Sequence, residues 1–482
     1  MTRPILQVRE FAIVRLSSYV ALMTKYLTLG IVTMMLIVGC NSDTQLQNDG
    51  ISQRNTLTED KTLKLWWDKG FNPEEDEALQ KLVRNWEQET GNKVQIHFYT
   101  LDVRAQKTQR YLQAGVAPDI FMSFKAESTL NPALAFENKL VDVTDIIKPV
   151  ENLYDPAALE TAYYYNNVKQ KRSYYAVPIH RAALHIYYWQ DLLAKTGRSA
   201  ADIPSDWDGF WQFWLDVGQE LRNKHQQDIY PIGLPLSAEA GDTYQAFEHV
   251  LEAYNVELLD SKGNLLVDEP QVRQGIIQCL DWYTRFYREG YVPKDAVDWT
   301  NADNNRLFLN QDILMTSNAT MSIPAALRKD RDTYINKLGI VEIPNKPNGE
   351  PMNHIFLVEQ AVIFNDAEHP KLAKEFLAYL TQPKVINQFL KDSGRHSPVH
   401  TAAYQDRYWT NPKDPHTSEV TKTLTKSKTR SIYPANSPAY SILLKENIWG
   451  QSLEKIVLDG VTPERAADEA IARIKAIFDE WE

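Results

Sequence analysis

The chain has 482 residues, of which 43% are hydrophobic and 24% are charged, a composition typical of a globular protein with two or more domains. Its formal net charge of −11 argues against nucleic acid as a partner, because proteins that bind nucleic acid carry a basic face. Two cysteines, Cys40 and Cys279, are too few for a disulfide framework, and the apolar neighbours of Cys279 predict a buried, inert thiol.

The first 39 residues have the features of an export signal. Residues 26–39 are apolar and uncharged, and Lys25 precedes them as the positive region of a signal peptide does. This segment is shorter than the roughly 20 residues that a membrane-spanning helix needs. The stretch before Met23 is unusually long for a signal peptide, which makes Met23 an alternative start of translation.

The end of this segment, Ile37-Val38-Gly39-Cys40, resembles the lipobox of bacterial lipoproteins, in which the cysteine is lipidated and becomes the mature N-terminus. The resemblance implies a lipoprotein signal peptide over 1–39 and a membrane anchor at Cys40. An ordinary signal peptide or a signal anchor is the alternative. Residues 40–60 are polar and without apolar periodicity, which predicts a lipidated, flexible tether.

Strand-like and helix-like segments alternate after the tether. Alternating apolar residues predict strands at 63–67 and 93–100, and a third, short strand is predicted after Pro118. Helical spacing predicts helices at 76–90 and 104–114, each followed by a glycine that ends it. This β-α-β-α-β order is typical of a parallel sheet covered by helices.

A second α/β block begins near Tyr175. It contains an aromatic helix at 210–217, and later strands are predicted at 313–316, 337–343 and 355–364. Further helices are predicted at 271–288, 370–380 and 462–481, the last with Thr462 as its N-cap and Pro463 in its first turn. The polar, lysine-rich region 401–431 is expected to be a solvated surface insertion.

The sequence contains no nucleotide-binding, metalloprotease or nucleophile-elbow motif. The ten histidines are scattered; His354, His396 and His400 form a group only if the fold brings them together. Carboxylates are numerous enough to supply a glycosidase pair, but no spacing selects one. The residues therefore predict no enzyme, no metal and no cofactor.

Eight stretches, in order, resemble the extracellular solute-binding proteins of bacterial sugar ABC importers, the family 1 group that includes maltose-binding protein. The resemblance covers about 63–478, and its pieces are LKLWWDKG (63–70), QAGVAPDIFMSF (113–124), LVDVTDII (140–147), YYAVPIHRAALHIYYWQDLLAKTG (174–197), IPSDWDGFWQF (203–213), ILMTSNATM (313–321), HPKLAKEFLAYLTQP (369–383) and VLDGVTPERAADEAIARI (457–474). In ILMTSNATM, Ala319 replaces the group's glycine and Met321 its usual tryptophan.

The resemblance implies an α/β, two-lobed periplasmic-binding-protein type II fold, each lobe a mainly parallel sheet flanked by helices, with a ligand cleft between the lobes. The expected N-terminal lobe is 61–178 with 357–400, and the expected C-terminal lobe is 182–353 with 432–482. The implied function is capture of a sugar, oligosaccharide or polyol by hinge closure and its delivery to the permease subunits of an ABC importer. Such a protein performs no catalysis, is exported to the periplasm or cell surface, and is expected to be a monomer. A secreted glycosidase and a ligand sensor for a signalling receptor are the alternatives.

The resemblance also implies which residues bind ligand, because open α/β sheets bind ligands at the carboxyl ends of their strands. The candidates are Trp66, Trp67, Asp68, Lys69, Ser123, Phe124, Lys125, His180, Arg181, Trp299, Asn301, Ser317, Asn318, Thr320, Arg395, Ser397 and Tyr440. Side chains alternate faces along a strand, so one of Trp66 and Trp67 is expected to pack and the other to face the cleft.

Overall fold

The computed structural model describes residues 62–99, 117–431 and 437–481, which belong to one compact unit, Asp60–Glu482. The predicted signal peptide, Cys40, the tether and the helix at 104–114 lie outside the described residues. Within the described ranges, no helix is both long enough and apolar enough to cross a membrane.

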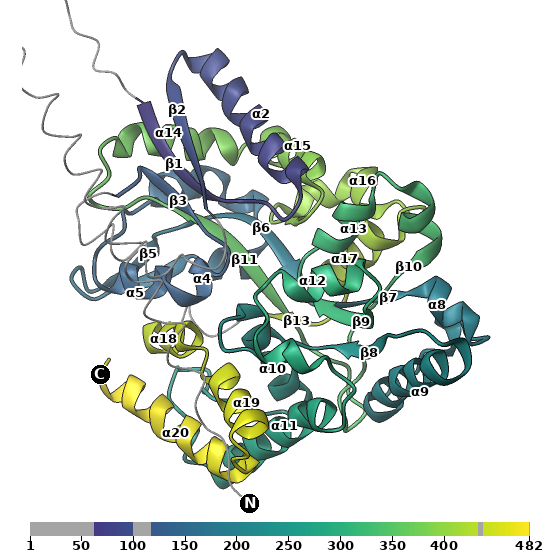
Figure 1. Ribbon diagram of the computed structural model, residues 1–482. Helices are drawn as coiled ribbons and strands as arrows, with labels where there is room; N and C mark the ends of the chain where they lie inside the picture. Colours follow the sequence, from purple (N-terminus) through teal and green to yellow (C-terminus); the bar gives the residue numbers. More distant parts are fainter. Residues whose placement is uncertain (1–61, 100–116, 432–436, 482) are drawn as a thin grey trace, which may run out of the picture. The chain divides into compact units, whose positions relative to one another are not determined.

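The described residues form a seven-stranded sheet in the order β12-β6-β11-β3-β1-β2, with β13 beside β11 (Figure 1). Its strands are β1 (Thr62–Asp68), β2 (Lys93–Tyr99), β3 (Ile120–Met122), β6 (Val177–Ala183), β11 (His354–Val362), β12 (Ser397–Pro398) and β13 (Thr429–Arg430). Strand β1 is parallel to β2 and β3, whereas β11 is antiparallel to both β3 and β6.

The first strand and helix show why these residues form these elements. In β1, Leu63, Leu65 and Trp67 are buried on one face and Lys64 is exposed on the other, as the period of two requires. Helix α2 (Pro73–Thr90) begins with a capping box of Asn72 and Glu75 and ends at Gly91, whose φ of 75° favours glycine.

A second sheet has the order β10-β7-β9-β8, formed by β7 (His185–Trp189), β8 (Tyr230–Gly233), β9 (Ile313–Asn318) and β10 (Leu338–Val341). Helices α9 (Trp207–His225) and α11 (Pro270–Arg288) supply aromatic side chains to its core, where the Trp207 and Trp282 rings lie 4.9 Å apart. Helices α19 (Ile448–Leu458) and α20 (Pro463–Asp479) contact α11 (Figure 1).

The described residues build two hydrophobic cores, one around each sheet. The first takes its residues from 63–183 and 356–424, with Met321; the second takes them from 184–355 and 439–477, with Leu357. Two sheets with two cores agree with the predicted two-lobed α/β fold. The expectation of mainly parallel sheets is wrong, because β6 and β11 run antiparallel to each other and β7 is antiparallel to β9 and β10. The predicted lobe boundaries stay a prediction.

Further elements are a hairpin and several helices, many of which place side chains in these cores. They are the hairpin β4 (Tyr163–Asn166) and β5 (Lys171–Tyr174), and the helices α4 (Ala126–Thr129), α5 (Asn131–Phe136), α6 (Thr144–Ile147), α7 (Pro156–Glu160), α8 (Gln190–Lys195), α10 (Gly241–Ala253), α12 (Asp303–Leu309), α13 (Ser322–Leu327), α14 (Pro370–Leu380), α15 (Pro383–Ser393), α16 (Arg407–Thr410), α17 (Pro415–Lys426) and α18 (Pro438–Glu446).

The region 401–431 is not a solvated insertion, so that prediction is wrong. Helices α16 and α17 lie within it, and Trp409, Val420 and Leu424 are buried in the first core. The lysine-rich composition concealed the helical spacing of Val420 and Leu424, which places both on one face of α17. The buried thiol predicted at Cys279 is confirmed: the residue is fully buried, and this burial raises the thiol pKa well above its usual value.

Candidate ligand-binding site

A pocket lies between the elements of the two cores, and most of the residues that line it are polar or charged. The first sheet and its loops contribute Phe71, Phe124, Lys125, Glu127, Glu359 and Arg395; the second contributes Asp242, Gln245, Asn301, Asn305, Asn318 and Thr320. A neighbouring pocket shares Phe124, Lys125 and Asn301 and adds Ser123 and Tyr244. Amides, hydroxyls and charged groups from distant segments therefore meet at one place.

Lys125 connects the two halves of this wall. It follows β3 in a left-handed conformation, with a φ of 69°, and its Nζ lies 2.8 Å from Asp242 Oδ1 and 2.7 Å from Asn301 Oδ1. The side chain passes over Gly241, where a Cβ would come within 2.6 Å of Nζ. A glycine at the start of α10 thus leaves room for an ion pair between the two halves.

Arg395 makes a second connection. Its Nη1 lies 3.0 Å from Glu75 Oε2, its Nε donates to Thr320 Oγ1 at 3.3 Å, and its guanidinium lies 4.2 Å from the centroid of the Phe124 ring. Both members of the Arg395–Glu75 pair are buried. A buried arginine in such a pair is held in one position, here with its guanidinium over an aromatic ring.

Amide and hydroxyl groups around α12 and α13 form a network beside Arg395. Asn318 donates to Asn305 Oδ1, Asn305 donates to Ser322 Oγ at 3.0 Å, and the Thr320 backbone N–H donates to Asn318 Oδ1 at 2.9 Å. Asn72, at the start of α2, donates to the Ser322 carbonyl at 3.0 Å. This network fixes the orientation of the amides in the pocket wall.

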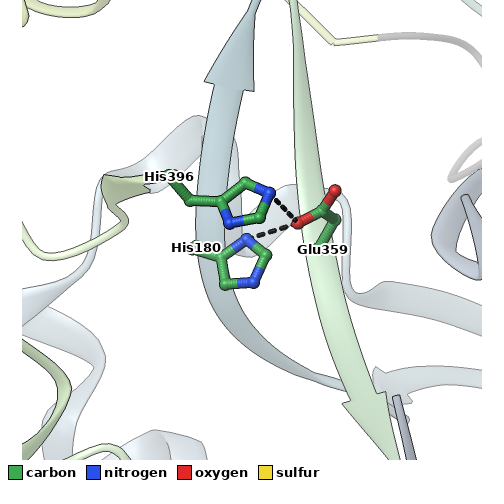
Figure 2. A group of neighbouring side chains, drawn as sticks. All are labelled: His180, Glu359 and His396. Carbon is green, nitrogen blue, oxygen red and sulfur yellow. Dashed lines mark ion pairs between the residues drawn. The ribbon is translucent and has the colours of Figure 1, made fainter. Parts of the chain in front are cut away.

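Glu359 contacts two histidines at the base of this region (Figure 2). Glu359 on β11 is paired in register with His180 on β6, and one carboxylate oxygen faces both His180 Nδ1 and His396 Nε2, the latter at 3.1 Å. The two imidazole rings are stacked, with centroids 3.8 Å apart and planes 15° apart. Burial lowers the pKa of both histidines well below the usual value; His396 adds to this for His180, and Arg395 for His396. Both imidazoles are therefore neutral near pH 7.

In the described part of the chain, these three side chains have ligand atoms close enough to hold a metal ion, all within 4.8 Å of one another. An imidazole nitrogen binds a metal along its lone pair, which lies in the ring plane. Two stacked, nearly parallel rings do not share such a point, so one ring must turn before both can bind one ion. The observed arrangement fits two neutral imidazoles on one carboxylate better than a metal site. His354 and His400 are not in this group.

Glu127 is a buried carboxylate in the pocket wall. It is 7% exposed, Oε1 accepts from Ser128 Oγ at 3.3 Å, and Oε2 has no hydrogen-bond partner among the described residues. Burial, and after it the negative charge of Glu359, raises the pKa of Glu127 well above its usual value. The positive charge of Lys125, which is paired with Asp242, offsets this rise of the pKa only in part.

Six of the residues predicted from sequence line the central pocket, and Ser123 lines the neighbouring one. The six are Phe124, Lys125, Asn301, Asn318, Thr320 and Arg395. Asp68 supports them, since its carboxylate accepts from the Phe124 backbone N–H. His180 lies behind the wall, in contact with Glu359.

The other predicted residues lie elsewhere. Trp67 packs in the first core against Phe389, and Trp66 lies beside His97, with ring centroids 5.8 Å apart. Neither tryptophan lines the two pockets.

Six further predicted residues have structural contacts. Lys69 pairs with Asp76, Arg181 with Asp155, and Tyr440 donates to Glu248; Trp299 is buried in the second core, Ser317 lines a small apolar cavity, and Ser397 is buried in β12.

Sequence reasoning missed the ring of Phe71 and six polar residues of the wall: Glu127, Asp242, Gln245, Asn305, Ser322 and Glu359. Asp242 and Gln245 lie in the first turns of α10, where an acidic residue is common for helix stability alone, so the pattern carried no signal for binding. Glu359 interrupts the apolar run of β11 and is buried, and a lone carboxylate in a buried strand was the signal available.

The sequence of this chain matches one known protein family. The family model for bacterial extracellular solute-binding proteins matches residues 72–386. A search of curated protein sequences found no match to the chain.

Solved structures match most of the chain. An ABC transporter solute-binding protein from Thermotoga lettingae TMO, bound with α-D-tagatose, is 19% identical over 86% of this chain and 99% of its own, with a TM-score of 0.72. The maltose-bound MalE3 of T. maritima is 19% identical over 86% and 100%, with a TM-score of 0.70. A solute-binding protein from Agrobacterium radiobacter K84, in complex with ribitol, is 18% identical over 86% and 98%, with a TM-score of 0.68. These similarities confirm the two-lobed fold.

Proposed function

Since the chain belongs to the bacterial extracellular solute-binding proteins, we propose that it is the binding component of a carbohydrate ABC import system. It captures a sugar, oligosaccharide or polyol between its two lobes and delivers it to the permease subunits in the membrane. Proteins of the same fold bind tagatose, maltose and ribitol, which supports a polyhydroxylated ligand.

The observation that carries this proposal is the composition of the pocket wall. Carboxylates and amide oxygens accept hydrogen bonds from hydroxyl groups, and Lys125, Arg395 and the amide nitrogens donate to hydroxyl oxygens. The phenyl rings of Phe71 and Phe124 supply apolar surface for the C–H faces of a sugar. A ligand rich in hydroxyl groups forms hydrogen bonds with the polar groups of the wall, whereas an apolar ligand would leave these groups without partners.

Hinge closure is the proposed mechanism. Lys125 reaches Asp242 and Asn301, and Arg395 reaches Thr320. Each contact therefore joins the two sides of the pocket wall. A ligand that touches both sides gains contacts that exist only when the lobes are together, and it therefore shifts the population towards the closed form. The protein binds and releases its ligand without chemical change.

We further propose that the protein is exported as a monomer and held at the membrane by a lipid at Cys40. The sequence Ile37-Val38-Gly39-Cys40 supports the anchor. Fractionation of cells tests it: the wild type should sediment with membranes, whereas Cys40→Ser should be recovered in the soluble fraction or remain unprocessed.

A thermal-shift screen of sugars, polyols and oligosaccharides tests the function. A ligand at about 100 times its dissociation constant stabilises the native state by about 2.7 kcal/mol, which is readily seen as a higher melting temperature. Asn318→Ala should abolish the shift without preventing folding. No shift with any member of the screen would contradict the proposal. Release of smaller products from an oligosaccharide, lost in Glu127→Gln, would favour the glycosidase alternative.

A further inference from the structure

The charged side chains of the pocket wall are unequally paired. Lys125 has Asp242 as its carboxylate, at 2.8 Å, and Arg395 has Glu75, at 3.0 Å. Glu359 contacts the two imidazoles of His180 and His396, which burial keeps neutral. Among the described residues, Glu127 accepts from the Ser128 hydroxyl but forms no ion pair, and Lys125 acts on it only at longer range. The acidic groups of the wall therefore outnumber its cations.

Glu127 shows the consequence of this excess most clearly. Its Oε2 is buried without a hydrogen-bond partner among the described residues, in a side chain that lines the pocket. The carboxylate is close enough to Glu359 for the two charges to repel each other. An ionised carboxylate in such a place is costly unless a cation comes with it, and a protonated one forfeits its strongest interactions.

We propose that the ligand is a sugar or polyol that carries an amino group, and that its ammonium binds at Glu127, on the side of the wall shared with Glu359. This inference rests on the proposed function and specifies its substrate class. An ammonium brings one positive charge and three N–H donors, whereas a hydroxyl at the same position brings one donor and no charge. The hydroxyl groups of the ligand are bound by Asn301, Asn318 and Thr320, which would serve a ligand without an amino group equally well.

An ammonium fits this site better than a metal ion. The nitrogen ligands nearest to the carboxylates are the stacked rings of His180 and His396, which cannot both direct a lone pair at one ion without turning. An ammonium needs only acceptors, and the wall offers the carboxylate of Glu127 and the amide oxygen of Gln245.

Isothermal titration calorimetry on matched ligand pairs tests the proposal. The pairs are D-glucosamine with D-glucose, D-galactosamine with D-galactose, and 1-amino-1-deoxy-D-sorbitol with D-sorbitol, at pH 6.5, where the amines are protonated. In at least one pair the amine should bind tenfold tighter or more. Glu127→Gln keeps the size of the side chain and should remove that preference. Glu257→Gln, which removes the same charge from an exposed position after α10, should leave it intact.

The outcomes separate this inference from the proposed function. If neutral members bind as tightly as their amines, or if Glu127→Gln keeps the preference, the inference fails and the proposed function stands. If none of the six ligands binds while neutral oligosaccharides do, the inference fails as well. Binding of Mg²⁺, Ca²⁺ or Zn²⁺ that Glu127→Gln abolishes would show a metal site instead and overturn it. If Glu127→Gln does not fold, the wild-type protein is titrated with N-acetyl-D-glucosamine instead. This uncharged analogue must bind at least tenfold more weakly than D-glucosamine.

Discussion

Replacing Arg395 by methionine should destabilise the protein strongly. The change removes the guanidinium but keeps a side chain of similar length, so the apolar contact with Phe124 is largely retained. Glu75, which is 9% exposed, would then lie buried opposite no cation. Its other oxygen still accepts from the Asn72 backbone N–H in the capping box, so helix α2 keeps its first turn.

The magnitude follows from the burial of the pair. Removing one member of a buried ion pair costs about 3–5 kcal/mol, because the remaining charge is left uncompensated. Removing one member of an exposed pair costs about 0–1 kcal/mol. The Arg473–Glu446 pair, with side chains 42% and 31% exposed, provides the matched control: Arg473→Met should cost less than about 1 kcal/mol.

Urea unfolding, followed by far-UV circular dichroism, measures both variants. Glu75→Gln in the Arg395→Met background should restore more than about 1 kcal/mol, because it removes the unpaired charge. If Arg395→Met costs no more than Arg473→Met, or if the double variant is no more stable than the single one, then burial does not determine the strength of this pair and the reasoning is wrong.

Three further predictions concern Lys125, the effect of pH and the two tryptophans. Lys125→Met should weaken ligand binding about tenfold or more in calorimetry, since a hydrogen bond to a charged group contributes about 1.5–3 kcal/mol. The free energy of unfolding should change by less than about 1 kcal/mol, and an unchanged affinity would count against a role of Lys125 in binding. Burial lowers the pKa of His249 to about 3, so the unfolded state binds its proton first and stability is lost as the pH falls below 6.5. At pH 5 this loss is about 2 kcal/mol, and His249→Phe, measured by urea unfolding at pH 7 and pH 5, should reduce the difference by that amount. Trp67→Ala should cost about 3–5 kcal/mol because the side chain is buried in the core, whereas Trp66→Ala, at a half-buried site, should cost clearly less; equal losses would contradict the assigned faces.

Much of the secondary structure was predictable because its causes are local. The alternation of Leu63, Leu65 and Trp67 predicted β1, and the spacing of Leu79, Leu82 and Trp86 predicted α2. Thr462 caps α20 as expected, accepting from the Arg465 backbone N–H. The helix α17 was missed, because its polar and lysine-rich sequence outweighed two apolar residues in a judgement from composition.

The pocket was only partly predictable, because its residues come from separate segments. Strand ends indicated Lys125 and Asn318, and the resemblance indicated Arg395. Nothing near Glu127 or Glu359 in the sequence shows that each becomes buried beside the other. The prediction that one of Trp66 and Trp67 faces the cleft assumed that the end of β1 reaches the ligand, whereas neither lines the two pockets.

The sequence by itself indicated the family of this protein and several of its elements, among them β1, α2 and α20, because periodicity, helix caps and ordered motifs are properties of neighbouring residues. The tertiary structure decided which carboxylates have a partner. Whether a charge is compensated depends on side chains far away in the chain: Arg395 meets Glu75, Lys125 meets Asp242, and Glu127 keeps one buried oxygen without a hydrogen bond among the described residues. Burial makes that difference large, since a charge without a partner is costly only where water is excluded.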